Sequence, residues 1–416
     1  MNRSADDPSN SGNGVQVDPT AGLHSHAAAL PETVRELSIE VATTLSELQR
    51  LKPDYERLHR IAANTSPFAL LDWHMAWCEH FLNLDPHVRD DIMVLVLRDP
   101  RADCVAIVPL IVSARRFGPL NVVSIELLGA DPSTTETRTP LVAPGYEALT
   151  VRAVRRRLAQ RQDWDWITWG GVDEKFGQEL AMDANLHMQP EAPGYMLDLP
   201  STWPEFRSGL KRNIRESLRH GYNSLKRGGH TFSLEVATEP AAVHRGIERF
   251  LMLHSSRAHM TGTIEHPDHF AGQASKRFLF AVCATLSARG IVRVFQLRIG
   301  TEVVAIRIGF VVGDGLYLYY SGFDPRWARY GVMTTALAES LKYAIAQGLK
   351  TVNLSRGTDP SKTRWSPRAI KYSTVLELRR RPTSRVAHRC YLSARSGKGL
   401  QFWILRFLGR SRRVWD

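Results

Sequence analysis

The sequence predicts an α/β (α+β) fold of two successive units, each with a mixed, mostly antiparallel sheet flanked by helices. Three observations support this prediction. The segment 295–354 reads as two or three strands, a helix and a final strand. The segment 92–169 repeats that order of elements, and a chain of 416 residues is long enough for two domains.

The strands of the second unit follow from β-branched composition and turn residues. Two β-branched runs, 295–299 and 303–312, are separated by a short loop that contains glycine, which is the pattern of a β-hairpin. A Gly-Asp-Gly turn then leads into a third, aromatic run at 316–320. Pro325 ends this third strand, because proline cannot donate a hydrogen bond to a ladder.

A helix and a last strand complete the second unit. Apolar residues at Met333, Leu337 and Leu341 fall on one face at a period of about 3.6 residues, which predicts an amphipathic helix. Gly348 lies where the C-terminal cap of this helix belongs. The run 349–354 then reads as the final strand.

The loop before this helix has the character of an anion site. Arg326, Arg329 and Gly331 immediately precede the first helical turn. The N–H groups of a first turn lack intrahelical acceptors, and the positive end of the helix dipole attracts negative charge. The sequence therefore predicts that a phosphate group binds here.

The order and spacing over residues 295–365 resemble the core of the GNAT acyltransferases, in which the pyrophosphate of acyl-CoA lies on the N-terminus of the helix after the fourth strand. Only Gly331 of the family's usual glycine pair is present. Further traits resemble the tandem-GNAT group of FemABX peptidyltransferases and CelD-like proteins of bacterial polysaccharide operons. These are the basic helix before the core, the strand end Tyr320-Ser-Gly-Phe-Asp-Pro325 and the step Lys362-Thr-Arg-Trp365.

The resemblance implies two tandem GNAT-like units and acyl-CoA as the co-substrate, with no metal. It places the cofactor phosphates against the loop before the helix and against the basic helix that opens the second unit. The residues that it assigns to cofactor binding are Arg326, Arg329, Tyr330, Gly331, Val332, Arg212 and Arg215.

Acyl transfer requires a polarised thioester carbonyl and removal of a proton from the acceptor amine or hydroxyl. A strand splayed from its neighbour frees backbone N–H groups for the carbonyl, and we expect the strand end at 319–321 to do this. The candidates for proton transfer are Tyr320, Asp324 and Lys362, with Tyr372 as a fourth. The candidates for substrate contact are Tyr319, Ser355 and Trp365, and we expect Lys362 and Trp365 to close the cleft.

The domain organisation has four regions. They are a disordered segment at 1–32, a first GNAT-like unit at 33–190, a second, catalytic unit at 191–378 and a basic tail at 379–416. The first unit has no Arg-x-x-x-Gly run before its helix, and Arg138 lies in a loop closed by Pro140. We therefore interpret the first unit as degenerate, with a structural or substrate-shaping role.

Periodicity assigns the remaining elements. The first unit is expected to contain helical stretches within 34–58, an aromatic helix over 66–81, strands at 92–97, 104–112 and 122–128, a helix at 147–160 and a strand at 164–169. The second unit is expected to open with a basic helix over 203–227, a strand at 232–236 and helices at 241–260 and 270–288. Four histidines near the junction of those two helices are interpreted as an exposed loop unless they line the acceptor pocket: His254, His259, His266 and His269.

Charge and cysteine content narrow the function classes. The formal net charge is +12, but eleven Lys or Arg and one acid lie between Arg379 and the C-terminus, so the body is nearly neutral. Nucleic-acid binding by the folded units therefore gains little support from charge. The four cysteines lack CxxC or metal-ligand spacing, so neither disulfides nor zinc is indicated, and a reduced cytoplasm is expected.

An apolar run at 400–408 in the tail has two interpretations. It is too short to span a bilayer as a helix, which needs about 20 residues. It either makes peripheral contact with a membrane, with the flanking arginines against anionic lipid, or docks on the second domain.

Three function classes remain open. The first is acyl-CoA-dependent N- or O-acyl transfer to a small-molecule, glycan or amino acceptor, including acceptors of the cell envelope or of polysaccharide synthesis. The second is FemABX-like transfer from aminoacyl-tRNA, and the third is a non-catalytic GNAT-fold accessory role. No specific nucleic acid is expected as a partner, except tRNA in the second class.

Overall fold

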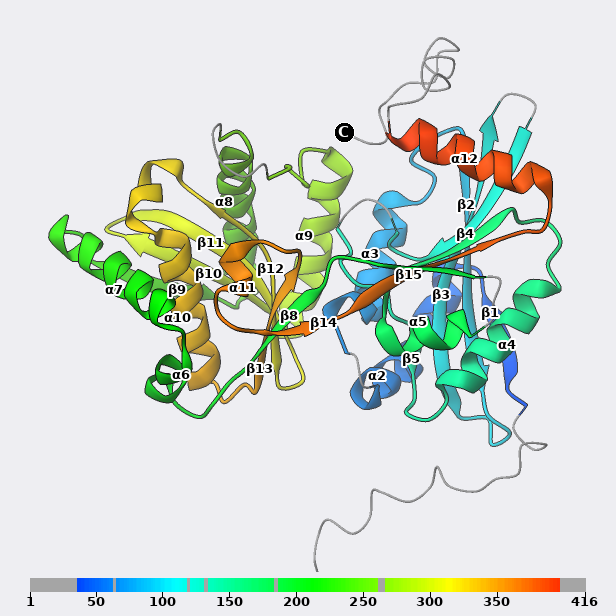
Figure 1. The fold of residues 1–416 in the computed structure, drawn as a ribbon, viewed down its shortest axis with the longest axis horizontal. Helices are drawn as coiled ribbons and strands as arrows, with labels where there is room; N and C mark the ends of the chain where they lie inside the picture. Colours follow the sequence, from blue (N-terminus) through cyan, green and yellow to red (C-terminus); the bar gives the residue numbers. More distant parts are fainter. Residues whose placement is uncertain are drawn as a thin grey trace, which may run out of the picture. The chain divides into compact units, whose positions relative to one another are not determined.

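The structure is a computed structural model, and it describes residues 36–62, 65–117, 120–130, 134–182, 186–260 and 266–396. These residues form two sheets, each with helices packed against it (Figure 1). The predicted α/β fold of two units, each a mixed sheet flanked by helices, is confirmed. The apolar run at 400–408 lies outside the described residues.

The first sheet has the strand order β1-β2-β3-β4-β6-β15-β7, and β5 pairs with β3. All pairs are antiparallel except β4 with β6. Its strands are β1 Ser38–Ala42, β2 Val88–Arg98, β3 Cys104–Phe117, β4 Leu120–Leu127, β5 Leu141–Val142, β6 Trp166–Asp173, β7 His187–Pro190 and β15 Tyr372–Leu378. The helices that accompany it are α1 Leu45–Arg50, α2 Lys52–Ile61, the 3₁₀ helix η2 Pro67–Ala69, α3 Leu71–Phe81, α4 Glu147–Ala159, α5 Glu174–Ala181 and α12 Pro382–Ser396.

The start of the described chain was only partly predicted. The helical stretches expected within 34–58 are present as α1 and α2. Strand β1 precedes them and pairs with β2, with Ser38 opposite Arg98. The β-branched residues Ile39 and Val41 suit this edge. The helix begins only after Thr44, which forms a capping box with Glu47.

The second sheet has the order β14-β8-β13-β12-β11-β10-β9. Only β12 and β13 run parallel, and the other pairs are antiparallel. Its strands are β8 Gly194–Asp198, β9 Phe232–Ala237, β10 Val292–Ile299, β11 Glu302–Val312, β12 Gly315–Phe323, β13 Thr351–Arg356 and β14 Arg368–Ile370. Its helices are α6 Trp203–Gly209, α7 Arg212–Arg227, α8 Pro240–Ala258, α9 Gln273–Ala288, the 3₁₀ helix η3 Pro325–Tyr330, α10 Val332–Ala346 and α11 Pro360–Thr363.

The single basic helix predicted over 203–227 is two helices. The chain leaves helical geometry at Leu210, which is extended and buries its side chain in the core of the second sheet. Glycine has a low helix propensity, and Gly209 directly precedes this break. Burial of Leu210 therefore overrides the helical pattern at this point.

The C-terminal segment returns to the first sheet. Strand β15 lies within residues 191–378, which we predicted as the second unit, yet it pairs with β6 and β7 of the first sheet. Helix α12 follows it, and Ala387 and Tyr391 of α12 pack against the buried Trp166. The first sheet therefore includes strand β15, which follows all strands of the second sheet in the sequence.

One aromatic core joins the two sheets. Phe68 of η2 contacts the ring of Tyr317 on β12 at 5.0 Å between centroids, and Trp73 of α3 contacts Phe310 on β11 at 5.9 Å. Burial of such large rings is a strongly stabilising contribution.

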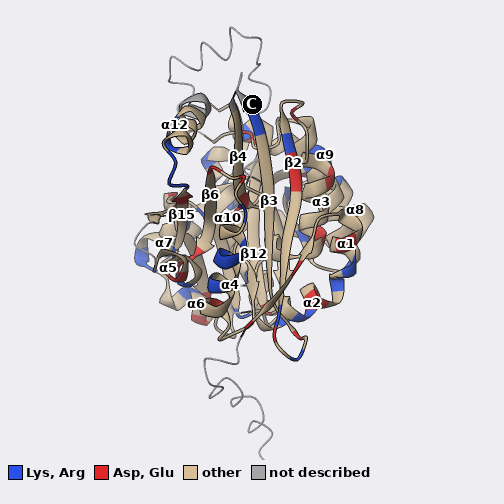
Figure 2. Ribbon diagram, turned by 90° about the vertical axis from the view of Figure 1, so that its right-hand side faces the viewer, with Lys and Arg blue, Asp and Glu red and all other residues tan. Residues whose placement is uncertain are grey.

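Strands β2, β3, β4 and β12 are uncharged over most of their length, and most Lys, Arg, Asp and Glu residues lie at strand ends and on helices (Figure 2).

Candidate active site

The site forms where the parallel strands β12 and β13 part. The two strands are paired over only three residues each, the last pair being Tyr317 with Asn353. Beyond this pair the strands diverge, so N–H and C=O groups on their facing edges have no ladder partner. The predicted splay at the end of the third strand is therefore present.

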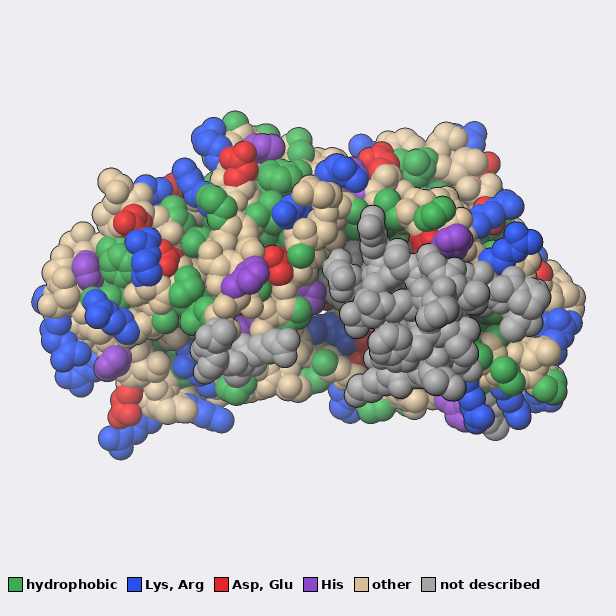
Figure 3. Space-filling model, turned by 90° about the horizontal axis from the view of Figure 1, so that it is seen from above, with side chains coloured by type: hydrophobic (Ala, Val, Ile, Leu, Met, Phe, Trp, Pro, Cys, Tyr) green, Lys and Arg blue, Asp and Glu red, His purple; other side chains and the backbone are tan. Residues whose placement is uncertain are grey.

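A cavity of about 870 Å³ lies beyond this parting. It is bounded by β11, the ends of β12 and β13, the start of α10, the C-terminal part of α8, the α11 segment and the loop 134–138 of the first unit. Figure 3 shows a hollow near the middle of the upper face, with blue basic and purple histidine side chains around it. The volume is that of a small-molecule site.

Four of the predicted site residues line the cavity together: Tyr319, Tyr320, Ser355 and Lys362. Burial raises the pKa of the Tyr320 phenol, which keeps it protonated at neutral pH. Burial also lowers the pKa of Lys362. The structure thus brings together residues of β12, of β13 and of the turn after β13.

The Lys362 ammonium group organises the turn after β13. It donates a hydrogen bond of 2.7 Å to Ser355 Oγ and another to the carbonyl oxygen of Arg356. Ser355 has a φ of +65°, which is costly for a residue with a side chain, and its N–H donates to Asn353 Oδ1 at 2.8 Å. Strained backbone of this kind is found at functional sites, where surrounding contacts maintain it.

Several predicted residues lie away from this cavity. Asp324 caps η3 and binds the guanidinium of Arg326, which also pairs with Glu302. The Arg326 side chain is 73% exposed, and Arg329 lies over the ring of Tyr330. Trp365 packs into the core of the second sheet and does not line the cavity.

The start of α10 has the geometry of a backbone anion site. Gly331 has a φ of +65° and an open space where a Cβ would lie, and Val332 begins the helix. Glycine is the residue that adopts this left-handed conformation at low cost. The cavity reaches Met333 and Thr334 in the first turn. The Thr334 N–H already donates to the Gly331 carbonyl oxygen at 3.0 Å, so the amides of Val332 and Met333 are the ones that remain for an anion.

Helix α7 approaches this turn with its C-terminal end. Gly228 lies beside the hydroxyl of Tyr330, while Tyr222, earlier in α7, bonds Glu339 far along α10. Arg212 and Arg215 are therefore at the opposite end of α7 from the predicted phosphate loop. Arg212 is 86% exposed and pairs with Glu216.

The sequence reasoning missed Glu136, which enters the cavity from the first unit. Its Oε2 accepts a 2.6 Å hydrogen bond from the Tyr317 hydroxyl and a 3.2 Å bond from the Arg356 N–H. Burial raises the pKa of Glu136, although Lys362, Tyr317 and Arg356 oppose the rise. The signal in the sequence was the polar cluster Thr134-Thr-Glu-Thr-Arg138, which lies between the predicted strand 122–128 and Pro140.

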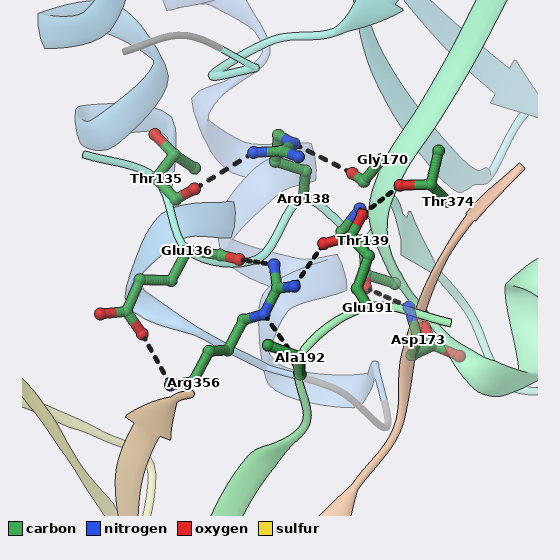
Figure 4. A network of polar contacts seen from close by, with 11 residues as sticks. Thr135, Glu136, Arg138, Thr139, Gly170, Asp173, Glu191, Ala192, Arg356 and Thr374 are labelled. Atoms are coloured by element: carbon green, nitrogen blue, oxygen red, sulfur yellow. Dashed lines mark hydrogen bonds and ion pairs between the residues drawn. The ribbon is translucent and has the colours of Figure 1, made fainter. Parts of the chain in front are cut away.

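A polar network holds this loop against β13 (Figure 4). Arg356 donates to the carbonyl oxygen of Glu136 at 2.6 Å and pairs with Glu191. Arg138 donates to the carbonyl oxygens of Thr135 at 3.2 Å and Gly170 at 2.9 Å. These bonds fix the position of Glu136 relative to the parting strands.

Three of the four histidines line the cavity: His254, His266 and His269. His254 Nδ1 lies 3.0 Å from the Ser321 carbonyl oxygen, and burial lowers the pKa of all three imidazoles. These three histidines therefore do not form the exposed loop that we expected. They line a pocket, which was the alternative considered for them. Within the described ranges, no group of three His, Cys, Asp or Glu side chains has the geometry to hold a metal ion.

A membrane-spanning helix is not found in the part of the chain that the structure describes, because each helix there is too short or too polar.

Part of the second unit resembles a known protein family. Residues 212–363 match the family model described as an acetyltransferase (GNAT) domain. None of the curated proteins matches the chain.

Solved structures align with the chain at low sequence identity. The crystal structure of FemX superimposes with a TM-score of 0.56 and 10% identity, covering 80% of this chain and 98% of that one. A conserved protein of unknown function from Bacteroides thetaiotaomicron aligns with a TM-score of 0.50 and 10% identity over 82% of this chain and 100% of its own. A tandem GNAT protein from the clavulanic acid biosynthesis pathway aligns with a TM-score of 0.42 and 12% identity, covering 82% and 98%. Residues 212–363 are therefore similar to a GNAT acetyltransferase domain, and the two sheets with flanking helices are consistent with two tandem GNAT-like units.

Proposed function

We propose that this protein transfers an acyl group from acyl-CoA to the amine or hydroxyl of a small-molecule or glycan acceptor. The observation that carries this proposal is the parting of β12 and β13 after Tyr317, which opens into a cavity that reaches the first turn of α10. Such a site offers strand amides beyond the end of the β12–β13 ladder for a thioester carbonyl, and helix amides for phosphates.

The donor fits the second unit in two places. The amides that follow Gly331 would hold the phosphates, with Arg329 and Tyr330 beside them. Arg364, whose guanidinium donates to Thr334 in the same turn, is a further phosphate contact that the sequence did not suggest. The strand end at 319–321 would polarise the acyl carbonyl.

Two side chains account for the proton movements. Glu136 would accept the proton of the acceptor nucleophile as the new bond to the acyl carbon forms, and its raised pKa brings it nearer to neutral pH. Tyr320, kept protonated by burial, would return a proton to the thiolate that leaves when the C–S bond breaks. Lys362 would hold the turn at Ser355 in place for both steps.

The acceptor class rests on resemblance. CelD-like proteins belong to polysaccharide operons, which favours an acceptor of the cell envelope or of polysaccharide synthesis. A cytoplasmic location, with peripheral membrane contact through the tail, fits that assignment and the unpaired cysteines Cys78, Cys104, Cys283 and Cys390.

Calorimetric titration of the full chain with acetyl-CoA tests the proposal. We expect saturable binding, followed by acceptor-dependent release of free CoA thiol when sugar amines, sugar alcohols and amino acids are supplied. A Glu136→Gln variant should bind acetyl-CoA normally and release thiol at least 100-fold more slowly. A folded wild-type chain that binds no acyl-CoA of any chain length would favour a non-catalytic accessory role.

One observation favours a second candidate, aminoacyl transfer from aminoacyl-tRNA. The exposed face of α7 carries Arg219, His220, Lys226 and Arg227 around a shallow depression, and Glu216 is the one acid that lines it. Such a basic helix suits a phosphate backbone, although the net charge of the body is small. Binding of charged tRNA that is lost in a triple variant, Arg219→Gln with Lys226→Gln and Arg227→Gln, would support this candidate over acyl-CoA.

A further inference from the structure

The cavity contains more positive than negative charge. Arg257, Arg307, Lys362 and Arg364 line it together with two carboxylates, Glu136 and Asp359. Glu136 is bound by Tyr317 and Arg356, and Asp359 caps α11 through the Ser361 N–H. Among the described residues, none of the four cations forms an ion pair with a carboxylate, although the charge of Asp359 acts on all four at longer range.

Arg307 has the most unusual environment of these four cations. It stands in the middle of the apolar strand β11, opposite Ser321 of β12. Its Nε is buried and has no hydrogen-bond partner in the part of the chain that the structure describes. Burial and the nearby Arg257 lower the pKa of Arg307 to about 10, against an opposing effect of Asp359, so the side chain remains a cation at neutral pH.

Arg257 approaches the same place from α8. It donates to the Ser321 hydroxyl at 3.2 Å and lies 2.8 Å from His266 Nε2. Both partners are neutral, because burial holds the pKa of His266 below its usual value. Arg257 and Arg307 thus both belong to the surroundings of Ser321, and Asp359, whose negative charge acts on both of them, lies outside ion-pair distance of either.

Such an arrangement is costly in the absence of a ligand. Two buried cations that share one carboxylate, Asp359, without direct contact recover little of the hydration that they lose, and two like charges repel each other as well. An arginine pair held this way is suited to a planar carboxylate or a phosphate, which accepts several N–H bonds at once. A single unpaired arginine in an apolar strand is otherwise hard to explain.

We propose that Arg257 and Arg307 form a subsite for an anionic group, a carboxylate or a phosphate, carried by the acceptor substrate. This inference rests on the proposed function, because it assigns the donor to the same cavity. The donor phosphates belong at the first turn of α10, near Arg364, whereas Arg257 and Arg307 flank Ser321 at the reacting end. The long pantetheine arm of CoA separates those two ends of the donor.

The first experiment measures anion binding without any reaction. Thermal unfolding of the full chain is followed in malonate and in inorganic phosphate, with sodium chloride at equal ionic strength as the reference. We expect both anions, or one of them, to raise the Tm of the wild type specifically. The anion that acts identifies the group as a carboxylate or a phosphate.

Variants decide whether Arg307 is responsible. Arg307→Met should weaken anion binding about 10- to 100-fold. Without anion its Tm should equal or exceed that of the wild type, because an uncompensated buried charge has been removed. Arg298→Met is the matched control, since Arg298 pairs with Glu235 on the same sheet but does not line the cavity. Arg257→Gln gives the same readout if Arg307→Met fails to fold.

Two outcomes overturn the subsite. Equal anion stabilisation of the wild type and Arg307→Met, or none in either, shows that no such subsite exists. A large loss of Tm in anion-free Arg307→Met and Arg257→Gln shows that both arginines serve only the fold.

The second experiment separates acceptor from donor. Acetyl-CoA is titrated into the protein in the presence of the saturating anion. An unchanged Kd for acetyl-CoA, in the wild type and in Arg307→Met, supports an acceptor subsite, and Arg364→Met should instead weaken acetyl-CoA. Competition between the anion and acetyl-CoA assigns the arginines to the donor and overturns the proposal. If the wild type binds no acetyl-CoA but binds the anion through Arg307, the acyl-CoA function fails while the anion subsite stands.

Discussion

The hydroxyl of Tyr317 donates a 2.6 Å hydrogen bond to Glu136, a residue 181 positions earlier that belongs to the other unit. Tyr317 is also the last residue of β12 that pairs with β13. The bond therefore places a carboxylate of the first unit at the mouth of the gap in the second sheet. A unit that lacks a phosphate loop of its own can contribute to the site in this way.

Tyr317→Phe tests the role of this bond. The change should cost about 1–2 kcal/mol in the free energy of unfolding, because a buried carboxylate loses one hydrogen-bond donor. The bond from Tyr317 lowers the pKa of Glu136, so its loss should raise that pKa. If Glu136 is the base, the acidic limb of the pH profile of kcat/KM moves to higher pH. Tyr343→Phe, whose hydroxyl bonds Arg293 outside the cavity, is the control, and an unmoved limb would exclude Glu136 as the base.

Substitution of Gly331 tests the phosphate cradle. Gly331→Ala meets no neighbouring atom, so only its left-handed backbone matters, at about 1–2 kcal/mol. Gly331→Val should cost more and should obstruct the approach of phosphates to the amides of α10. We expect Gly331→Asn, which tolerates this backbone, to bind acetyl-CoA more nearly as the wild type does. An unchanged acetyl-CoA affinity in a folded Gly331→Val protein would remove this loop from the donor site.

Lys362→Ala tests whether the turn after β13 takes part in turnover. The ammonium group bonds Ser355 and the carbonyl oxygen of Arg356, and its loss should release a strained turn that lines the cavity. We expect kcat to fall roughly 100-fold, the lower end of the range for loss of a positioned polar group. Lys350→Ala, at an exposed position before β13, should leave kcat unchanged. Normal turnover of Lys362→Ala would show that this lysine has no part in turnover.

His74 predicts a pH dependence of stability. Burial lowers the pKa of His74 to about 4, whereas the unfolded chain titrates near 6.5. Between these pH values the unfolded state binds more protons, so stability falls on acidification from pH 6.5 to 4, by about 3 kcal/mol from this residue. Urea unfolding of the wild type and of His74→Gln across this range measures the difference. Parallel pH curves for the two proteins would contradict the assignment, and His80→Gln on the same helix is the control.

Removal of α12 tests the return of the chain to the first sheet. A chain that ends at Arg381 exposes Trp166, which Tyr391 covers at 5.2 Å between ring centroids. The loss of this apolar contact should cost about 2–4 kcal/mol in the free energy of unfolding. A chain that ends at Ser396 keeps α12 and is the matched control. Equal stability of all three chains would mean that α12 contributes nothing to the core.

Much of the second sheet could be predicted from the sequence because its signals are local. The hairpin of β10 and β11 follows from two β-branched runs around Gly300, and α10 follows from an apolar stripe ended near Gly348. The sequence also placed Gly331 directly before α10, although its left-handed backbone is a finding of the structure. Period, turn chemistry and capping act between near neighbours in the chain, so one sequence suffices to find them.

Other features depended on which distant surfaces met. The sequence assigned residues 372–378, which form β15, to the second unit. In the structure β15 pairs with β6 of the first sheet, and Val375 of β15 is buried in the core. It placed Arg212 and Arg215 on a basic helix without showing that the other end of that helix meets Tyr330. It contained Arg307 as a single charge in an apolar strand, without showing that Arg257 would share its cavity. Burial and charge are summed over the whole fold, so only the tertiary structure decided which residues became one site.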